Sequence, residues 1–180
     1  RTLHNIYGDK IDCNAVDKSN KNALMLASLQ GHNDCITALH TCFGDTIDIN
    51  AVDKWNKNAL MLAAAKGHAD CITTLYNIYG NTIDYNAVDD NKYTVLMLAA
   101  RYGCADCITA LYNTYGKKIN YNVVDKYEKL NALMLATKNK NFDCITALLN
   151  TYGKRLNFNT HSSPGLLWLI VENGQVDCIK

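Results

Sequence analysis

The sequence predicts an all-α repeat solenoid, in which stacked helix-turn-helix units are joined by β-hairpin-like arms. The stretch Asn-Ala-Leu-Met-Leu-Ala occurs at 22–27, 58–63 and 131–136, and Thr-Val-Leu-Met-Leu-Ala occurs at 94–99. The leucines that open these Leu-Met-Leu cores are 36, 36 and 37 residues apart (Leu24, Leu60, Leu96 and Leu133). A fixed period in this range is typical of repeat arrays, which present long binding surfaces along their length.

The helices of one repeat are predicted from its apolar stretches and its glycines. Residues 24–27 predict a short first helix that ends near Gly31, because glycine suits the left-handed conformation that terminates a helix. A second helix is predicted to begin at Asn33 or Asp34, where a short acid or amide accepts from free N–H groups. Gly44 ends this second helix.

An arm and a turn then lead into the next repeat. Residues 46–50 alternate polar and apolar side chains, as an extended arm does, and residues 53–56 predict a turn. Repeated along the chain, these elements form one array with a partial repeat at each end (1–13; 14–49, 50–85, 86–121 and 122–158; 159–180). Because both ends interrupt a repeat, we expect the chain to be a segment of a longer protein.

Composition excludes several classes of function. Of the 180 residues, 48% are apolar and 19% are charged, so a continuous core is available. A net charge of +1 gives no strong field toward nucleic acid or anionic membranes. No apolar run approaches the roughly 20 residues that cross a bilayer. We therefore expect no nucleic-acid, membrane or small-molecule partner.

Five of the eight cysteines fall at one place in successive repeats (Cys35, Cys71, Cys107, Cys144 and Cys178). Equivalent atoms of stacked repeats lie about 10 Å apart, whereas a disulfide needs Cα atoms within about 7 Å. We therefore interpret this column as small buried apolar residues in a reducing, cytoplasmic compartment, or in host cytosol if the protein is a bacterial effector.

The repeat pattern resembles that of the ankyrin family. The residues that carry the resemblance are Asn14-Ala15-Val16-Asp17, then 22–27, then Gly31-His32 followed by Ile36 and Leu39. The family repeat has about 33 residues, so the resemblance implies a longer arm here. Met25, Met61 and Met97 stand where the family has histidine, so we expect its helix-start hydrogen bond to be replaced by an apolar contact.

Candidate catalytic and metal-binding residues are explained by the repeat. Cys104-Ala105-Asp106-Cys107 has the spacing of a redox or zinc motif, but zinc needs four ligands and no second pair exists. The aspartates recur in a turn column and in a helix-start column, whereas a catalytic pair is unique and convergent. The sequence therefore predicts no enzyme, no catalytic residue, no cofactor and no metal site.

Positions at which the repeats differ are the best candidates for function. In ankyrin-like arrays the hairpin tips and first helices line a concave binding face, and here these places carry aromatic and basic residues of the kind that dominate interfaces. The predicted partner-binding residues are Trp55, Lys57, Lys66, Tyr93, Arg101, Tyr102, Tyr127 and Lys138. The aromatic residues and Arg101 form the predicted centre, and lysines at the rim favour a protein partner with an acidic patch.

Three alternatives remain open at this point. In the first, the chain is a substrate-recruiting arm of a larger enzyme or secreted effector. In the second, it is a solenoid that reads RNA one base per repeat. In addition, the segments around Asn50 and Asn86 are similar to sites that asparaginyl hydroxylases modify in ankyrin proteins. An unchanged intact mass after incubation with such a hydroxylase would count against this modification.

Overall fold

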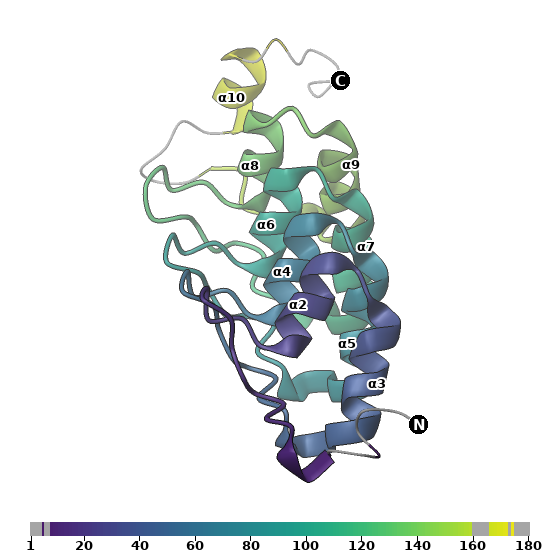
Figure 1. Cartoon of the computed structure of the whole chain (residues 1–180). Coiled ribbons are helices and arrows are strands. Elements are labelled where there is room, and N and C mark those ends of the chain that lie inside the picture. The colour runs from purple at the N-terminus through teal and green to yellow at the C-terminus, as the bar shows by residue number, and fades with distance from the viewer. Residues whose placement is uncertain (1–4, 6–7, 160–165, 173, 175–180) are drawn as a thin grey trace.

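The protein forms two parallel rows of helices with arms along one side (Figure 1). We describe it from a computed structural model, which covers residue 5, residues 8–159, residues 166–172 and residue 174. The inner row contains the first helix of each repeat: α2 (Ala23–Gln30), α4 (Ala59–Lys66), α6 (Val95–Tyr102), α8 (Ala132–Lys138) and α10 (Leu166–Glu172). The outer row contains α3 (Asn33–Phe43), α5 (Ala69–Tyr79), α7 (Ala105–Tyr115) and α9 (Phe142–Thr151). Each helix packs against its neighbours in the same row, which gives the stacked solenoid expected from the period.

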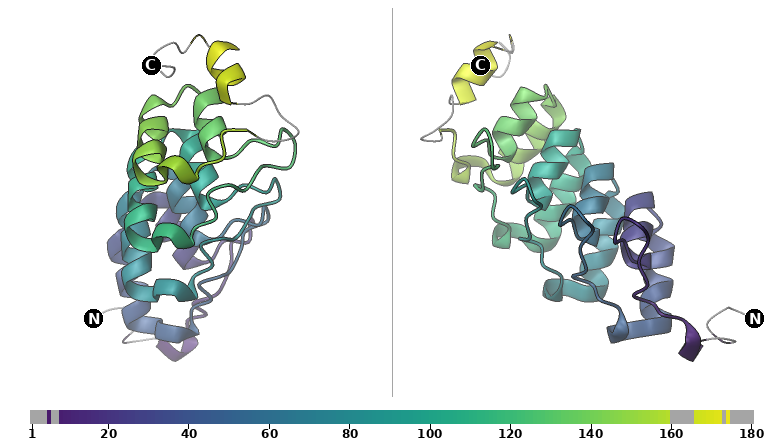
Figure 2. Two further views of the ribbon diagram at one scale, coloured as in Figure 1. Left: turned by 180° about the vertical axis from the view of Figure 1, so that it is seen from behind. Right: turned by 60° about the vertical axis from the view of Figure 1, so that its left-hand side comes forward.

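Short 3₁₀ helices connect the outer row to the arms. They are η1 (Gly8–Lys10), η2 (Gly44–Thr46), η3 (Gly80–Thr82), η4 (Gly116–Lys118) and η5 (Gly153–Arg155). The four arms that follow occupy residues 11–22, 47–58, 83–94 and 119–131 and lie side by side, as both views of Figure 2 show. The arms at 47–58, 83–94 and 119–131 therefore return the chain from the far end of an outer helix to the start of the next inner helix.

The arms are not β-hairpins, so this part of the predicted fold class is wrong. No β-strand occurs in the part of the chain that the structure describes. Thr46 belongs to a 3₁₀ helix, and Ile47 is anchored in the core at 5% exposure. The alternation of polar and apolar residues at 46–50 reflects the burial of Ile47. The arms are joined mainly through side chains, as described below.

The inner helices begin and end at specific polar and glycine residues. The Asn22 side-chain oxygen accepts a hydrogen bond of 2.9 Å from the Met25 N–H, and Gly31 ends α2 with a φ of 77°. Met25 itself is 1% exposed. The helix start is thus capped by the residue three positions earlier, and the methionine supplies the expected apolar contact. The same cap recurs at Asn58, Thr94 and Asn131.

The outer helices begin where predicted but without the predicted cap. The helix α3 starts at Asn33, and the preceding His32 makes no side-chain hydrogen bond to it. In later repeats this preceding residue contacts the neighbouring repeat instead. The Asn141 amide donates to the Ala100 carbonyl at 2.8 Å and to the Arg101 carbonyl at 3.1 Å. Such bonds fix the spacing between repeats.

The cysteine column is largely buried, and the structure contains no disulfide among its described cysteines, all seven of which are free. Burial raises the pKa of Cys71 to about 11 and the pKa of Cys107 to about 12, and raises that of Cys144 likewise to about 12. Such thiols are poor nucleophiles at neutral pH. Cys35 differs because it is exposed, and Cys178 lies outside the described residues.

Tyrosine rings pack between successive repeats at the arm end of the outer helices. Tyr115 meets Tyr76 edge-on, with ring centroids 5.1 Å apart, and stacks on Tyr85 at 4.7 Å. Tyr152 packs in the same way against Tyr112 and Tyr121. Aromatic pairs in these geometries contribute beyond their buried area, so the rings strengthen the contacts between repeats.

Candidate partner-binding surface

The exposed tips of the arms are turns closed by an aspartate, which is buried in every tip but the first. Asp53 is 3% exposed, and its Oδ1 accepts hydrogen bonds from the backbone N–H groups of Trp55 (3.0 Å) and Lys57 (2.9 Å). The Asp53 N–H donates to the Lys57 carbonyl at 2.9 Å, and Asn56 takes the left-handed conformation with a φ of 63°. This geometry leaves the residue at the apex of the turn, Trp55, exposed.

The same turn forms the other tips, which are Asp17–Lys21, Asp89–Tyr93 and the longer Asp125–Leu130. The inserted residue of the fourth repeat is accommodated here, because the Asp125 N–H donates to Leu130 instead of to the fourth residue along. The repeated aspartate therefore has an architectural role, as the sequence predicted for this column.

Backbone hydrogen bonds join each tip to the next. The Lys54 N–H donates to Ser19 at 3.1 Å, and the Lys126 N–H donates to Asn91 at 2.9 Å. Between them, the Asp90 N–H donates to Trp55 at 3.3 Å. The four tips thus form one continuous row whose members are held at a fixed spacing.

An asparagine ladder joins the arms below the tips. The Asn50 amide donates to the Thr82 carbonyl at 3.0 Å, and its side-chain oxygen accepts from the Asp84 N–H at 2.7 Å. Asn86 makes the equivalent pair of bonds to Lys118 and Asn120, at 3.0 and 2.8 Å. The ladder comprises Asn14, Asn50, Asn86 and Asn122. Both side-chain amides therefore donate and accept hydrogen bonds between neighbouring arms. Hydroxylation at Asn50 or Asn86 stays a prediction.

Exposed aromatic rings at the tips carry cations over their faces. The Lys54 ammonium lies 4.6 Å from the Trp55 ring centroid, and the Lys21 ammonium lies 4.9 Å from it. The Lys126 ammonium lies 5.7 Å from the centroid of the Tyr127 ring. Such pairs are favourable because the ring face is negative.

Tyr93 and Arg101 form another such pair in the middle of the array, and a hydrogen bond also joins them. The Arg101 guanidinium lies 5.2 Å over the Tyr93 ring, and one of its N–H groups donates to the Tyr93 hydroxyl at 2.8 Å. Partial burial is the main factor that raises the pKa of Tyr93, and the Arg101 charge acts in the opposite direction. The phenol therefore stays neutral and the guanidinium is held in one position.

Comparison with protein families identifies the array. A family model described as ankyrin repeats (3 copies) matches residues 2–89, 43–125 and 78–160. This chain belongs to the ankyrin-repeat family. A comparison with curated proteins gave no match. Ankyrin repeats generally serve as protein–protein interaction modules, and members of the family are typically not enzymes.

The ankyrin array places the eight predicted residues in different settings. Trp55, Tyr127 and the Tyr93–Arg101 pair lie on or beside the row of tips, as described above. Tyr102 and Lys66 are exposed at the ends of inner helices, and their side chains make no hydrogen bond, ion pair or ring contact with described residues. The structure therefore joins only part of the predicted set by direct contact.

Two of the predicted lysines are engaged in ion pairs. The half-buried Lys57 lies 3.9 Å from the Asp89 carboxylate of the next tip, and Lys138 pairs with Glu128. Lys57 therefore supports the row of tips. Sequence reasoning missed Glu128, and it also missed Lys21, which pairs with Asp53 at 3.9 Å beneath the Trp55 ring. The shared column of Lys21 and Lys57 was the available signal.

We define the tip face as the tips together with the last two residues of α2, α4, α6 and α8. Its exposed charges are seven cations and three acids (Lys18, Lys54, Lys66, Lys92, Arg101, Lys126 and Lys138; Asp17, Asp90 and Glu128). The aspartates that close the later tips are buried (Asp53, Asp89 and Asp125). A chain with a net charge of +1 thus has its positive charge concentrated on this ankyrin face.

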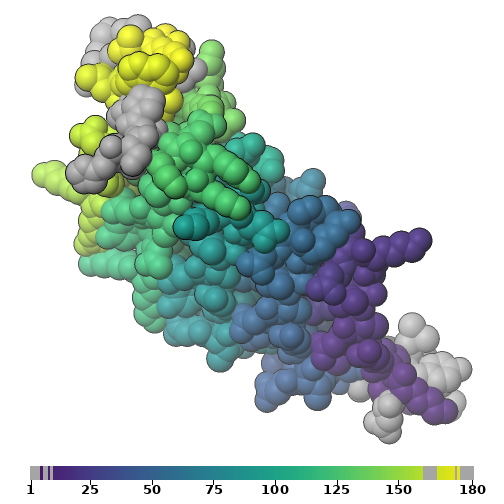
Figure 3. All heavy atoms as spheres, turned by 90° about the vertical axis from the view of Figure 1, so that its left-hand side faces the viewer, coloured from purple at the N-terminus to yellow at the C-terminus, as the bar shows by residue number. Residues whose placement is uncertain are grey.

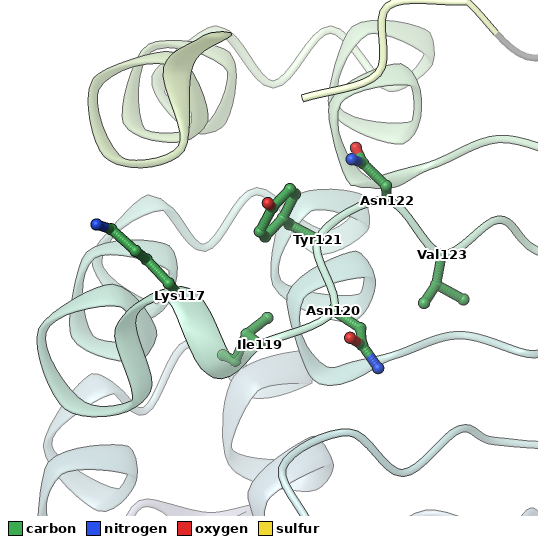
Figure 4. Close-up of a pocket in the computed structure, with 6 residues that line it drawn as sticks. All are labelled: Lys117, Ile119, Asn120, Tyr121, Asn122 and Val123. Atoms are coloured by element: carbon green, nitrogen blue, oxygen red, sulfur yellow. The ribbon is translucent and has the colours of Figure 1, made fainter. Parts of the chain in front are cut away.

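Hollows between the arms offer little chemistry. One encloses about 420 Å³ beside Lys117, Tyr121 and Asn122, and Figure 4 shows that the side chains of Asn120 and Asn122 point away from each other. Two further hollows of about 360 and 400 Å³ recur between earlier arms, beside the asparagine ladder. Among the described residues no group of three or more His, Cys, Asp or Glu side chains is placed to hold a metal ion.

None of the helices in the described ranges combines the length and the apolar character that crossing a bilayer requires.

Proposed function

We propose that this ankyrin array binds a partner protein across the tip face, which corresponds to the concave face expected from the sequence. The observation that carries this proposal is the exposure of large aromatic side chains at the turn apices, 47% for Trp55 and 68% for Tyr127. Aromatic residues and arginine contribute most of the energy at protein interfaces. The proposed binding residues are Trp55, Lys57, Lys66, Tyr93, Arg101, Tyr102, Tyr127 and Lys138.

The charge of the tip face supports a partner with an acidic patch. Its exposed cations outnumber its exposed acids, and complementary charge raises the association rate and excludes cationic competitors. The free and buried thiols of the core suit a reducing compartment, so we propose that binding takes place in the cytoplasm, or in host cytosol for an effector. A substrate-recruiting arm of a larger enzyme would use this same surface.

Affinity capture tests the surface directly. The chain is immobilised and exposed to cytosolic lysate, in parallel with Trp55→Ala/Tyr102→Ala and Trp55→Ala/Tyr127→Ala. Removing one binding hot spot typically costs about 2 kcal/mol, or roughly thirtyfold in affinity, so captured proteins are expected to disappear with both double variants. Phe142→Ala is the matched control, since this ring is 51% exposed at the start of the outer helix α9.

Two outcomes would contradict the proposal. Undiminished capture by both double variants would show that the tip face does not bind the captured proteins. Capture that depends on RNA, and is lost after ribonuclease treatment, would favour the RNA-binding solenoid.

A further inference from the structure

We propose that the partner presents an extended acidic segment, with carboxylates three residues apart, that lies along the row of tips. The inference rests on the protein-binding function proposed above and specifies the chemistry of the partner. Two properties of the tip face carry it. One is the way in which its aromatic rings are covered by cations, and the other is the spacing of the tips.

The chain's own cations already cover the aromatic faces that a cationic ligand would need. Lys54 and Lys21 lie over Trp55, and Arg101 lies over Tyr93. Lys126 occupies the same position over Tyr127. A ligand that approaches this surface therefore meets ammonium and guanidinium groups backed by rings. These groups recognise anions, and arginine in particular binds a carboxylate through two parallel N–H groups.

Arg101 is prepared for this role. A guanidinium has five N–H donors, and only one of them is engaged, by the Tyr93 hydroxyl at 2.8 Å. This bond and the stacking on the ring hold the side chain before a ligand arrives, which reduces the entropy lost on binding. Arg101 is exposed and makes no ion pair with a described carboxylate. Its counter-ion is therefore left for a partner to supply.

The spacing of the tips sets the spacing of the carboxylates. Each repeat adds one tip to the row, and the stacked helices that carry the tips lie about 8–10 Å apart. The repeat distance is therefore about 10 Å. An extended peptide in the polyproline II conformation rises about 3.1 Å per residue and has three residues per turn, so three residues span one repeat and the side chains at i, i+3 and i+6 share one face. Carboxylates at i, i+3 and i+6 then meet Lys54, Arg101 and Lys126 in order.

An extended segment suits the shape of this side better than a helix. Helical ligands insert an apolar face into a groove, whereas the two hollows beside the earlier arms are lined largely by asparagines. Figure 3 looks onto the side of the tips and shows successive repeats crossing the surface as adjacent bands. A segment that runs across these bands contacts one cation per repeat.

Fluorescent peptides test the spacing on the intact chain. A 12-residue Gly/Ser peptide with Glu at every third position is compared with an isomer that has its four Glu together, with a peptide that has Lys at the same positions, and with a 12-nucleotide oligo-uridine. Anisotropy is measured at low and at physiological salt. The spaced acidic peptide is expected to bind at least about fivefold tighter than its isomer, because only it pairs each carboxylate with a separate repeat.

Charge-neutralising variants connect the binding to the tip face. Lys54→Gln/Arg101→Gln is expected to weaken the spaced peptide about tenfold, the upper range for two exposed ion pairs. Lys117→Gln/Lys154→Gln is the matched control, because it removes the same charge from exposed residues of η4 and η5. It is expected to change affinity less than twofold.

Several results would overturn the inference. Equal affinity for the spaced and clustered peptides would refute the three-residue register, and tighter binding of oligo-uridine or of the lysine peptide would refute an acidic protein segment. If the tip face captures a protein in the lysate experiment but the spaced peptide neither binds nor competes, the proposed function stands and this partner class is wrong.

Discussion

Replacing Asn86 by alanine measures how much the asparagine ladder contributes to the array. The side chain of Asn86 donates to the Lys118 carbonyl at 3.0 Å and accepts from the Asn120 N–H at 2.8 Å. These two bonds join neighbouring arms and connect residues that are 32 and 34 positions apart in sequence. A net intramolecular hydrogen bond contributes about 1 kcal/mol. Losing both, and leaving two backbone groups without partners, is expected to cost about 2 kcal/mol.

Urea unfolding followed by circular dichroism provides the assay. With a dependence of about 2 kcal/mol per molar urea, as is usual for small proteins, the loss lowers the midpoint by about 1 M. Asn122→Ala is expected to have a similar effect, because Asn122 makes the same pair of bonds one repeat further along. Asn113→Ala is the control, since Asn113 is exposed in α7 and its side chain has no hydrogen bond within the described structure.

A shift below about 0.3 M for Asn86→Ala, or a shift no larger than that of the control, would refute the reasoning. In that case the arms would be held by the tip-to-tip bonds and the buried isoleucines, and the repeated asparagines would be replaceable turn formers. A loss much greater than 2 kcal/mol would instead show that unpairing one arm unfolds its neighbours, as nearest-neighbour coupling in a repeat array allows.

Three further predictions concern the core. Tyr115→Phe is expected to leave stability unchanged or raise it by up to about 1 kcal/mol, since the buried Tyr115 hydroxyl has no hydrogen-bond partner and Phe43 occupies the equivalent place; a clear loss in urea unfolding would contradict this. Cys104→Asn is expected to add about 1 kcal/mol by reproducing the bonds of Asn141, which an unchanged midpoint would disprove. Burial raises the pKa of the Cys71, Cys107 and Cys144 thiols, so they stay protonated in the folded chain at a pH where the unfolded chain loses these protons. The free energy of unfolding is therefore expected to be fully present below pH 9 and to fall between pH 9.0 and about 11–12, by at most about 1.4 kcal/mol per pH unit and thiol. Ala variants of these cysteines that show the same slope would exclude the thiols as its source.

The repeat encodes much of the fold directly in the sequence. The helix α2 has the predicted short length and ends at Gly31 in the left-handed conformation, and the second helix begins at Asn33. These features are local, because a helix and its glycine stop depend on residues within a few positions of each other. The burial of Cys71, Cys107 and Cys144 also follows from their shared column, since equivalent positions in stacked repeats have equivalent neighbours.

The arms were less predictable because their hydrogen bonds join residues more than 30 positions apart. Alternation around Ile47 and Ile49 is compatible with a strand, and only the arrangement of neighbouring arms shows that Asn50 is bonded to Thr82 and Asp84. The recurrence of asparagine at one column was visible, but its role depends on the register between arms. A single repeat read alone favours the interpretation of Asn as a turn former.

In the candidate site, too, the exposure of single residues could be predicted from the sequence, whereas the ion pairs between residues could not. Exposure of Trp55 and Tyr127 follows from their place in a variable column, whereas the pairing of Lys57 with Asp89 and of Lys138 with Glu128 requires the fold. These ion pairs reduce the number of cations that are free to meet a partner. The predicted binding residues stay a prediction, and the structure leaves fewer of their cations available than the sequence suggested.

The elements that stabilise the array also determine what it can recognise. The asparagine ladder and the tip-to-tip bonds hold the arms at a constant repeat distance, and each of the last three tips is closed by a buried aspartate whose charge is withdrawn from the surface. Because the acids are used inside the turns, the lysines and Arg101 dominate the exposed apices. A chain that is nearly neutral as a whole therefore displays an excess of exposed cations along the row of tips, and the bonds between arms hold that row in place.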